Sequence, residues 1–437
     1  MIKKPLILFI LKLFHAKIGA QKQHYQKNQT ILVMTNKNKI SIFLFTLIIS
    51  LPLFSQEKIE TTGKIPIVAW HGIYCDDMTE ERFREQKEAG FTINFSFCAN
   101  NEQLEKALDA ADKAGMQMII TTPELRSEPE KTVRQFMDHP ALAGYFLKDE
   151  PLASEFAELG AWAKRIQSVD NKKFCYLNLF PTGGQAHFDA LGVKNYREYI
   201  SRFDKEVPLP FLSFDHYPII NDSIKAEWYE NLEEFSDEAK KVDKDFWAFA
   251  LATTHNVPGG VYPVPTLAML RLQMNSNLAY GAQGLQYFTY WTPRDNSYWD
   301  FQHGPIGLDG KRTEVYDLVK EMNREIQQIA GVFLGAKVLS VHHTGNQIPT
   351  KTRRLTLLPD KVKALDTHGS GAIISQLEND DQKYIVIVNR DYKRAMRLTF
   401  VADEGLQRVL KDGSIVPASN YTSTMTVLPG DIMIYRY

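Results

Sequence analysis

The feature that most constrains the fold is a regular alternation of short apolar runs with longer charged stretches. The apolar runs are rich in β-branched and aromatic residues and have the length of strands, whereas the stretches between them have the spacing of amphipathic helices. Eight strands are predicted, at 65–70, 91–98, 116–121, 143–147, 174–179, 211–214, 246–251 and 285–290. Helices are predicted between them, including 155–169, 229–241 and 267–280.

Eight strand–helix repeats over roughly 270 residues match a (β/α)₈ TIM barrel in number and length. A doubly wound open sheet also alternates, but no Gly-x-Gly-x-x-Gly follows the first strand. The sequence therefore predicts an α/β barrel over residues 64–334. A helix with apolar Val315, Val319, Met322 and Ile326 on one face is expected to close it.

The residue pattern changes after Gly335. From there on, strand-like runs are separated by turn-forming pairs such as Asp412-Gly413, and no helical pattern appears. Residues 335–437 are therefore predicted to form a small all-β sandwich domain. The predicted strands include 354–358, 372–377, 384–389, 396–401 and 432–435.

The first residues have the pattern of a targeting segment. Apolar stretches at 5–14 and 40–54 are both shorter than the ~20 residues of a membrane-spanning helix. The second follows Met34 and two lysines, which is the layout of a secretory signal. We expect Met34 to be the true start and 1–56 to be an upstream extension plus signal. The protein would then be periplasmic or extracellular, without stable membrane insertion after cleavage; an uncleaved signal anchor is the alternative.

Charge and cysteine content exclude some classes of protein. Lys+Arg 51 against Asp+Glu 52 leaves a net charge of −1, so there is no basic excess for nucleic acid. Three cysteines, Cys75, Cys98 and Cys175, cannot make a disulfide framework, and none has the spacing of a zinc site. Each lies in or near an apolar run, so we expect buried free thiols.

Catalytic groups are expected after the barrel strands, because the loops at their carboxyl ends build the active site of this fold. Glu150 follows the fourth strand, where neighbouring apolar groups would keep it protonated, as a general acid at a glycosidic oxygen requires. Asp215, after the sixth strand, is the tentative base or nucleophile. A separation of ~5–5.5 Å would indicate retention and ~6.5–9.5 Å inversion. Both could instead be ordinary strand-end groups, and Asp149 could be a first-turn helix acid.

Other strand-end side chains are those that bind sugars, since aromatic faces stack on sugar rings while carboxylates and imidazoles bind hydroxyls. The predicted substrate-binding residues are His71, Asp149, Asn178, His216, Tyr217, His255, Tyr290 and Trp291. No His-x-His follows the first strand, and His-Glu-x-x-His and Gly-x-Ser-x-Gly are absent, so neither a metal, another cofactor nor a serine nucleophile is expected. His342 and His343 in the β domain are expected to form an exposed pair.

Three motifs at the strand ends resemble those of a known enzyme group. They are Gly-Tyr-Phe-Leu-Lys-Asp-Glu-Pro at 144–151, Ser-Phe-Asp-His-Tyr-Pro at 213–218 and Gly-Ala-Gln-Gly-Leu-Gln-Tyr-Phe-Thr-Tyr-Trp at 281–291, and the segment 316–323 also looks like a barrel-closing helix. The barrel resembles glycoside hydrolase clan A, particularly family 42 β-galactosidases with a trailing β domain. The resemblance implies an acid/base at Glu150 and an aromatic floor at Trp291.

One departure from that group concerns strand seven, where clan A enzymes carry the nucleophilic glutamate. Here the segment 246–255 ends in Ala-Thr-Thr-His and has no carboxylate. Either the strand numbering is off or the usual pair is broken, so that Asp215 or Asp149 substitutes, inversion replaces retention, or sugar is bound without cleavage. We predict a secreted glycoside hydrolase acting on a poly- or oligosaccharide. The alternative is a catalytically inactive glycan-binding barrel of a polysaccharide-utilisation system.

Overall fold

The computed structural model describes residues 28–31, 45–48, 63–294, 298–418 and 424–437. The chain divides into two units, 1–57 and 58–437. In the first, β1 (Asn28–Ile31) pairs antiparallel with β2 (Phe45–Ile48). The predicted start at Met34 and most of the predicted signal lie outside the described residues. Within the described part of the chain, no helix is long and apolar enough to cross a membrane.

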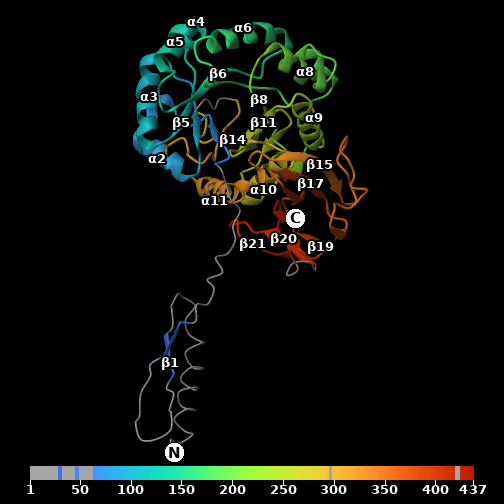
Figure 1. The fold of residues 1–437 in the computed structure, drawn as a ribbon. Helices are drawn as coiled ribbons and strands as arrows, with labels where there is room; N and C mark the ends of the chain where they lie inside the picture. Colours follow the sequence, from blue (N-terminus) through green and yellow to red (C-terminus); the bar gives the residue numbers. More distant parts are fainter. Residues whose placement is uncertain (1–27, 32–44, 49–62, 295–297, 419–423) are drawn as a thin grey trace, which may run out of the picture. The chain divides into compact units, whose positions relative to one another are not determined.

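The second unit begins with an eight-stranded parallel barrel, which confirms the predicted fold class (Figure 1). Its strands in chain order are β3 (Ile67–Trp70), β4 (Ile93–Phe95), β5 (Gln117–Ile120), β6 (Leu142–Asp149), β7 (Phe174–Asn178), β8 (Phe211–Phe214), β11 (Asp245–Leu251) and β14 (Gly284–Phe288). Neighbouring strands pair in parallel from β7 through β3 and β14 to β8. The Leu179 amide donates to the Ser213 carbonyl oxygen at 2.8 Å, which joins β7 to β8 and closes the barrel.

Helices surround the barrel and pack on its outer face. They are α2 (Glu80–Glu88), α3 (Asn101–Ala114), α4 (Pro123–Ser127), α5 (Pro129–Phe136), α6 (Phe156–Gln167), α7 (Gln185–Leu191), α8 (Tyr196–Glu206), α9 (Trp228–Lys241), α10 (Leu267–Ala279), α11 (Glu314–Gln328) and α12 (Ala330–Phe333). In α3 the side chains of Leu104, Leu108 and Ala111 are buried at helical spacing, as the apolar pattern predicts. The helix starts at the Asn100 cap and ends at Gly115, whose φ of +66° suits glycine.

The barrel interior is filled by side chains that alternate along each strand. Val68, Phe95, Phe146 and Phe249 belong to one buried inner cluster, whereas the intervening residues face the helices. This alternation follows from the period of two in a strand. The barrel is therefore a packed core, and chemistry is confined to its ends.

Two antiparallel sheets follow the barrel and form the β domain. One is ordered β15 (Lys337–Thr344), β17 (Ala372–Asn379), β18 (Gln382–Asn389), β23 (Ile432–Arg436), β20 (Gln407–Val409) and β21 (Ile415–Pro417), and the other β16 (Val362–Asp366), β19 (Met396–Ala402) and β22 (Met425–Val427). Phe400 of one sheet stacks on Tyr435 of the other, with ring centroids 4.0 Å apart, so the sheets pack face to face. The prediction of a strand at 354–358 is wrong. Arg354 forms only an isolated bridge, and the Leu357 side chain is 82% exposed, so it does not pack against the core.

The β domain packs against the barrel mainly through α10. The Asn275 side chain donates to the Gly430 carbonyl oxygen at 3.0 Å, and the Tyr280 hydroxyl lies 2.7 Å from His343 Nε2. The expected exposed pair of histidines is therefore wrong for His343, which is fully buried. Successive residues of β15 face opposite sides, so His343 turns to the barrel while His342 stays partly exposed.

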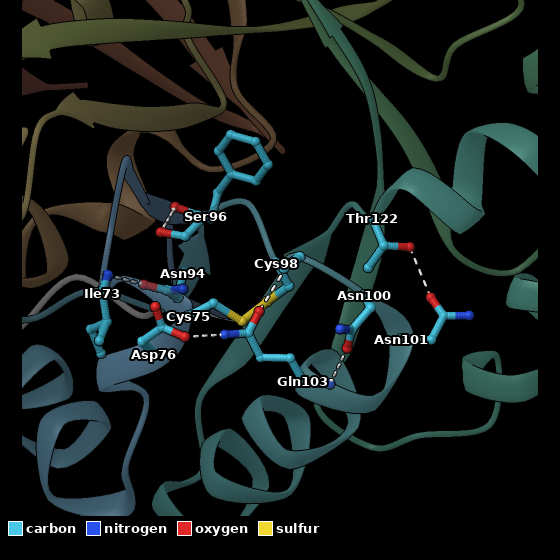
Figure 2. The surroundings of a disulfide bond; sticks show 12 residues. Ile73, Cys75, Asp76, Asn94, Ser96, Cys98, Asn100, Asn101, Gln103 and Thr122 are labelled. Carbon is cyan, nitrogen blue, oxygen red and sulfur yellow. Dashed lines mark hydrogen bonds between the residues drawn. A yellow bond between two sulfur atoms is a disulfide. The ribbon is translucent and has the colours of Figure 1, made fainter. Parts of the chain in front are cut away.

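A disulfide joins Cys75 to Cys98, so the prediction of free thiols is wrong for both (Figure 2). Cys75 follows β3 and Cys98 follows β4, and these neighbouring parallel strands bring the two loops together with a Cα–Cα distance of 5.3 Å. The Asn94 side chain accepts from the Ile73 amide at 2.9 Å beside the bridge. Cys175 is a buried free thiol, as predicted.

Replacing Cys75 and Cys98 together with serine is expected to lower the free energy of unfolding by about 2–4 kcal/mol, because the cross-link restricts the unfolded chain. Urea unfolding of the wild type and the double variant, each with and without a reductant, measures the change. Reductant should destabilise only the wild type. Equal unfolding free energies for oxidised wild type and variant would contradict the prediction.

Candidate active site

A cavity of about 400 Å³ opens at the carboxyl ends of the barrel strands. It is lined by Trp70, Asp149, Glu150, Asn178, Pro181, Asp215, His216, Tyr217, Lys225, Phe249, His255, Val257, Tyr262, Phe288, Trp299 and Phe301. A second hollow, of about 1040 Å³, involves residues next to the amino ends of the strands, such as Pro66 and Phe211, and Asp245 is the one carboxylate among the described residues that line it. The carboxyl-end cavity therefore gathers the groups capable of acid–base chemistry.

Three carboxyl groups meet in this cavity around the side chain of Asn178. Asp149 ends β6 with Glu150 directly after it, Asn178 ends β7, and Asp215 follows β8. Asn178 Nδ2 donates to Asp149 Oδ1 at 3.2 Å and to Asp215 Oδ1 at 2.8 Å. Asn178 Oδ1 accepts from the Ser213 hydroxyl at 3.0 Å, which orients the amide. Three consecutive strands thus hold the carboxyl groups in one cluster.

The backbone at Glu150 has an unusual conformation. Its φ is +46°, in the left-handed region that residues with a Cβ rarely adopt. The Glu150 amide donates to the Asn178 carbonyl oxygen at 2.8 Å, which holds this conformation at the strand end. The side chain forms a hydrogen bond with Asp215, so the two carboxyl groups are in direct contact.

Burial and mutual repulsion set the protonation of this cluster. Desolvation, followed by the charges of Asp215 and Asp149, raises the pKa of Glu150 to about 9. Desolvation and the Asp215 charge raise the pKa of Asp149 to about 7. Burial also raises the pKa of Asp215, but hydrogen bonds from Asn178, Tyr217 and Glu150 oppose the rise. A hydrogen bond between two carboxyl groups requires one proton, and these partners place it on Glu150 and the charge on Asp215.

The loops after strands six, seven and eight form one wall of the cavity. After β8 come β9 (Ile219–Ile220) and β10 (Ser223–Ile224), and after β11 come β12 (His255–Val257) and β13 (Gly260–Tyr262). The Asn221 amide donates to the Val261 carbonyl oxygen at 3.0 Å, linking the first two loops. The Asn256 amide donates to the Trp299 carbonyl oxygen at 2.6 Å, linking the second and third.

Two neutral imidazoles and one lysine lie in this wall. Burial and the nearby charge of Lys225 lower the pKa of His216 to about 3 and that of His255 to about 4. Lys225 Nζ donates to the Tyr262 hydroxyl at 2.6 Å. No group of three or more His, Cys, Asp or Glu side chains in the described part of the chain could hold a metal ion.

The cavity brings together seven of the ten side chains proposed from the sequence: Asp149, Glu150, Asn178, Asp215, His216, Tyr217 and His255. His71, Tyr290 and Trp291 do not line it. His71 Nε2 lies 3.0 Å from the Tyr74 hydroxyl. Tyr290 packs on Phe91 in the layer between barrel and helices, and Trp291 lies under the Arg82 guanidinium. Tyr290 and Trp291 lie outside the cavity because β14 ends at Phe288, so the residues after it no longer alternate between inward-facing and outward-facing positions.

Sequence reasoning missed the aromatic lining Trp70, Phe249 and Phe288, and also Lys225 and Tyr262. The three aromatic residues occupy inward-facing positions near the strand ends, so the period of two could have identified them. Lys225 and Tyr262 come from the paired loops after β8 and β11. Their meeting depends on loop pairing, for which the sequence has no local signal.

Comparisons with solved structures agree in fold. The β-galactosidase from Bacillus circulans sp. alkalophilus has a TM-score of 0.57 at 8% identity, over 85% of this chain and 99% of that one. A GH42 β-galactosidase from G. stearothermophilus, solved as a catalytic mutant, has a TM-score of 0.54 at 8% identity, over 87% of this chain and 99% of that one. The β-galactosidase from the psychrophilic Marinomonas ef1 has a TM-score of 0.44 at 11% identity, over 61% of this chain and 60% of that one. No family model and no curated protein matches the sequence.

The first two likenesses show the fold: the chain has the fold of the GH42 β-galactosidases, a parallel barrel followed by antiparallel sheets. The strand numbering used for the sequence is right, because β11 is the seventh barrel strand. Residues 251–255 at its carboxyl end contain no carboxylate. The chain therefore shares the fold but departs from the clan A pattern at the end of strand seven, where a glutamate would be expected.

Substituting Glu150 with glutamine is expected to change the pH dependence of stability. The folded-state pKa of Glu150 is raised from 4.5 to about 9, so its favourable contribution is present below pH 4.5 and is lost as pH rises toward 9. The stability of the variant relative to wild type should therefore increase across this range, by up to about 1.4 kcal/mol per pH unit. Urea unfolding at several pH values measures it. Glu105→Gln, an exposed change on α3, is the control, and parallel curves for wild type and Glu150→Gln would contradict the assignment.

Proposed function

We propose that the protein is a glycoside hydrolase that cleaves an O-glycosidic bond of a poly- or oligosaccharide. The observation that carries the proposal is the hydrogen-bonded pair of Glu150 and Asp215 in an aromatic-lined cavity at the carboxyl end of the barrel. One carboxyl group that keeps its proton beside one that carries charge is the arrangement that acid-catalysed glycoside cleavage requires. The fold shared with GH42 β-galactosidases supports this reaction class.

In the proposed mechanism, Glu150 donates its proton to the glycosidic oxygen as the bond to the anomeric carbon breaks, and the leaving sugar departs as an alcohol. Asp215 attacks the anomeric carbon and forms a glycosyl ester. A water molecule, deprotonated by the Glu150 carboxylate, then hydrolyses this ester and restores both groups. Asn178 and Tyr217 position Asp215 by hydrogen bonding, and Asp149 is assigned to a sugar hydroxyl.

The contact between the two carboxyl groups favours retention over inversion. Inverting hydrolases separate their carboxyl groups by ~6.5–9.5 Å to admit a water molecule, and retaining ones by ~5–5.5 Å. Glu150 and Asp215 are hydrogen-bonded, so their spacing is nearer to the retaining one. The substrate oxygen would replace Asp215 as the acceptor of the Glu150 proton when the sugar enters.

A catalytically inactive glycan-binding barrel is the second candidate. The observation that favours it is the absence of a carboxylate from residues 251–255, at the end of the seventh strand. In that case the aromatic wall and the polar cluster would bind a sugar, and the carboxyl pair would only accept and donate hydrogen bonds.

We also propose that the protein works outside the cytoplasm. The signal-like sequence before residue 57 supports this location. The Cys75–Cys98 disulfide adds an independent argument, because such bonds persist in oxidising compartments and are rare in the cytosol.

Glu150→Gln and Asp215→Asn are each expected to reduce hydrolysis at least 10²-fold, because each removes one of the two groups that act on the glycosidic bond. Reducing-sugar release from a panel of plant and microbial polysaccharides measures activity. Proton NMR of the first product formed should show the anomeric configuration of the substrate.

Glu158→Gln, an exposed change on α6, serves as the matched control and should leave the rate unchanged. Full activity of Glu150→Gln would remove this residue from the mechanism. Binding of a glycan by wild type without any product from the panel would support the inactive glycan-binding barrel. An inverted product would exclude Asp215 as the nucleophile.

A further inference from the structure

Lys225 is a half-buried cation without an ion-pair partner among the described residues. Its ammonium group lines the cavity and donates to the Tyr262 hydroxyl at 2.6 Å. Glu227 and Asp215 act on it electrostatically, but neither forms an ion pair with it. Removing an ammonium group from water is unfavourable unless an opposite charge compensates it, and Glu227 and Asp215 compensate it only through space, so the ammonium group is available to pair with an anion from outside the chain.

Neighbouring groups add unsatisfied polar atoms to the same cavity. His216 Nδ1, His255 Nδ1 and Trp70 Nε1 are buried and have no hydrogen-bond partner among the residues that the structure describes. Both imidazoles line the same cavity as Lys225, whose charge lowers their pKa. Nδ1 of a neutral imidazole can carry the proton, and the indole nitrogen can only donate. A ligand group that has only acceptors would satisfy this set.

The position of Lys225 is built into the fold. The Lys225 amide donates to the Pro218 carbonyl oxygen at 2.7 Å, which closes the loop after β8. From the β domain, the Tyr392 hydroxyl and Lys393 Nζ donate to the Asp222 carbonyl oxygen, at 2.6 and 2.8 Å. Two domains thus hold the loop that carries Lys225, as expected of a residue that contacts a ligand.

We propose that the sugar bound in this cavity carries a negatively charged substituent, a uronic acid carboxylate or a sulfate ester, and that Lys225 binds it. The proposal rests on the proposed function of the cavity as a sugar site. The carboxyl cluster carries less negative charge than three free carboxylates would, since Glu150 holds a proton, and hydrogen bonds from Asn178, Tyr217 and Glu150 partly compensate the charge of Asp215. Lys225 is the only cationic side chain among the described residues that line the cavity, and the His216 and His255 rings can present N–H groups to the anion from the same loop wall.

Binding can be tested separately from hydrolysis in the Glu150→Gln background. Calorimetry would compare oligogalacturonides and glucuronoxylan oligosaccharides with the same samples after carboxyl reduction, and sulfated galactan oligosaccharides with their desulfated forms. We expect at least one anionic probe to bind tenfold or more tightly than its neutral counterpart. The pair that discriminates identifies carboxylate or sulfate as the bound group.

Lys225→Met should remove that preference, with tenfold or greater loss for the anionic probe and less than twofold change for the neutral one. Lys225→Arg should keep most of the preference, and Tyr262→Phe, which removes only the hydroxyl that Lys225 binds, should weaken it partly. Lys106→Met, an exposed change on α3, controls for loss of positive charge.

Equal binding of charged and neutral probes by the parent, or an equal loss for both in Lys225→Met, would overturn the inference. Anion-selective binding that depends on Lys225, together with no hydrolysis by the wild type, would leave the inference standing and remove the proposed reaction. Hydrolysis of neutral sugars only would leave the proposed reaction standing and remove the inference about the anionic substituent.

Discussion

The site depends on the backbone register at the closure of the barrel, where β6, β7 and β8 end side by side. The Glu150 amide donates to the Asn178 carbonyl oxygen, and the Leu179 amide donates to the Ser213 carbonyl oxygen. These two bonds place Asn178 between the carboxyl groups of its neighbours. A shift of one residue in either pairing would turn Asn178 or the adjacent strand end to the other face of the sheet, and the cluster would be lost.

Exclusion of water gives this cluster its chemistry. Aromatic side chains from the barrel interior and from the loops after β8, β11 and β14 line the cavity. Because they desolvate the carboxyl groups, protonation becomes favourable near neutral pH, and two adjacent acids share a proton. The β domain contributes through the loop after β8, which it contacts at Asp222. Packing far from the carboxyl groups thus acts on the site through the loop that carries Lys225.

Much of the fold could be predicted because each strand and helix leaves a local pattern. The number of strand–helix repeats predicted the barrel. The positions at the carboxyl ends of strands four, five and six identified Glu150, Asn178 and Asp215 as candidate site residues. Other expectations failed where contacts between distant segments decide. Cys75 and Cys98 are paired because β3 and β4 are neighbours, and His343 is buried because its face of β15 meets α10. Tyr290 lies outside the cavity because β14 ends two residues earlier than its apolar run.

By itself, the amino-acid sequence determined the order of strands and helices, the barrel followed by a β domain, and the residues found at the strand ends. Periodicity is a local property of the sequence, so it can be recognised without knowledge of the tertiary contacts. Only the tertiary structure decided which strand-end groups share one cavity, which carboxyl group holds the proton, and that Lys225 faces the site without an ion-pair partner in the described part of the chain. These properties depend on distance and on exclusion of water, which arise only when segments far apart in the chain are brought together.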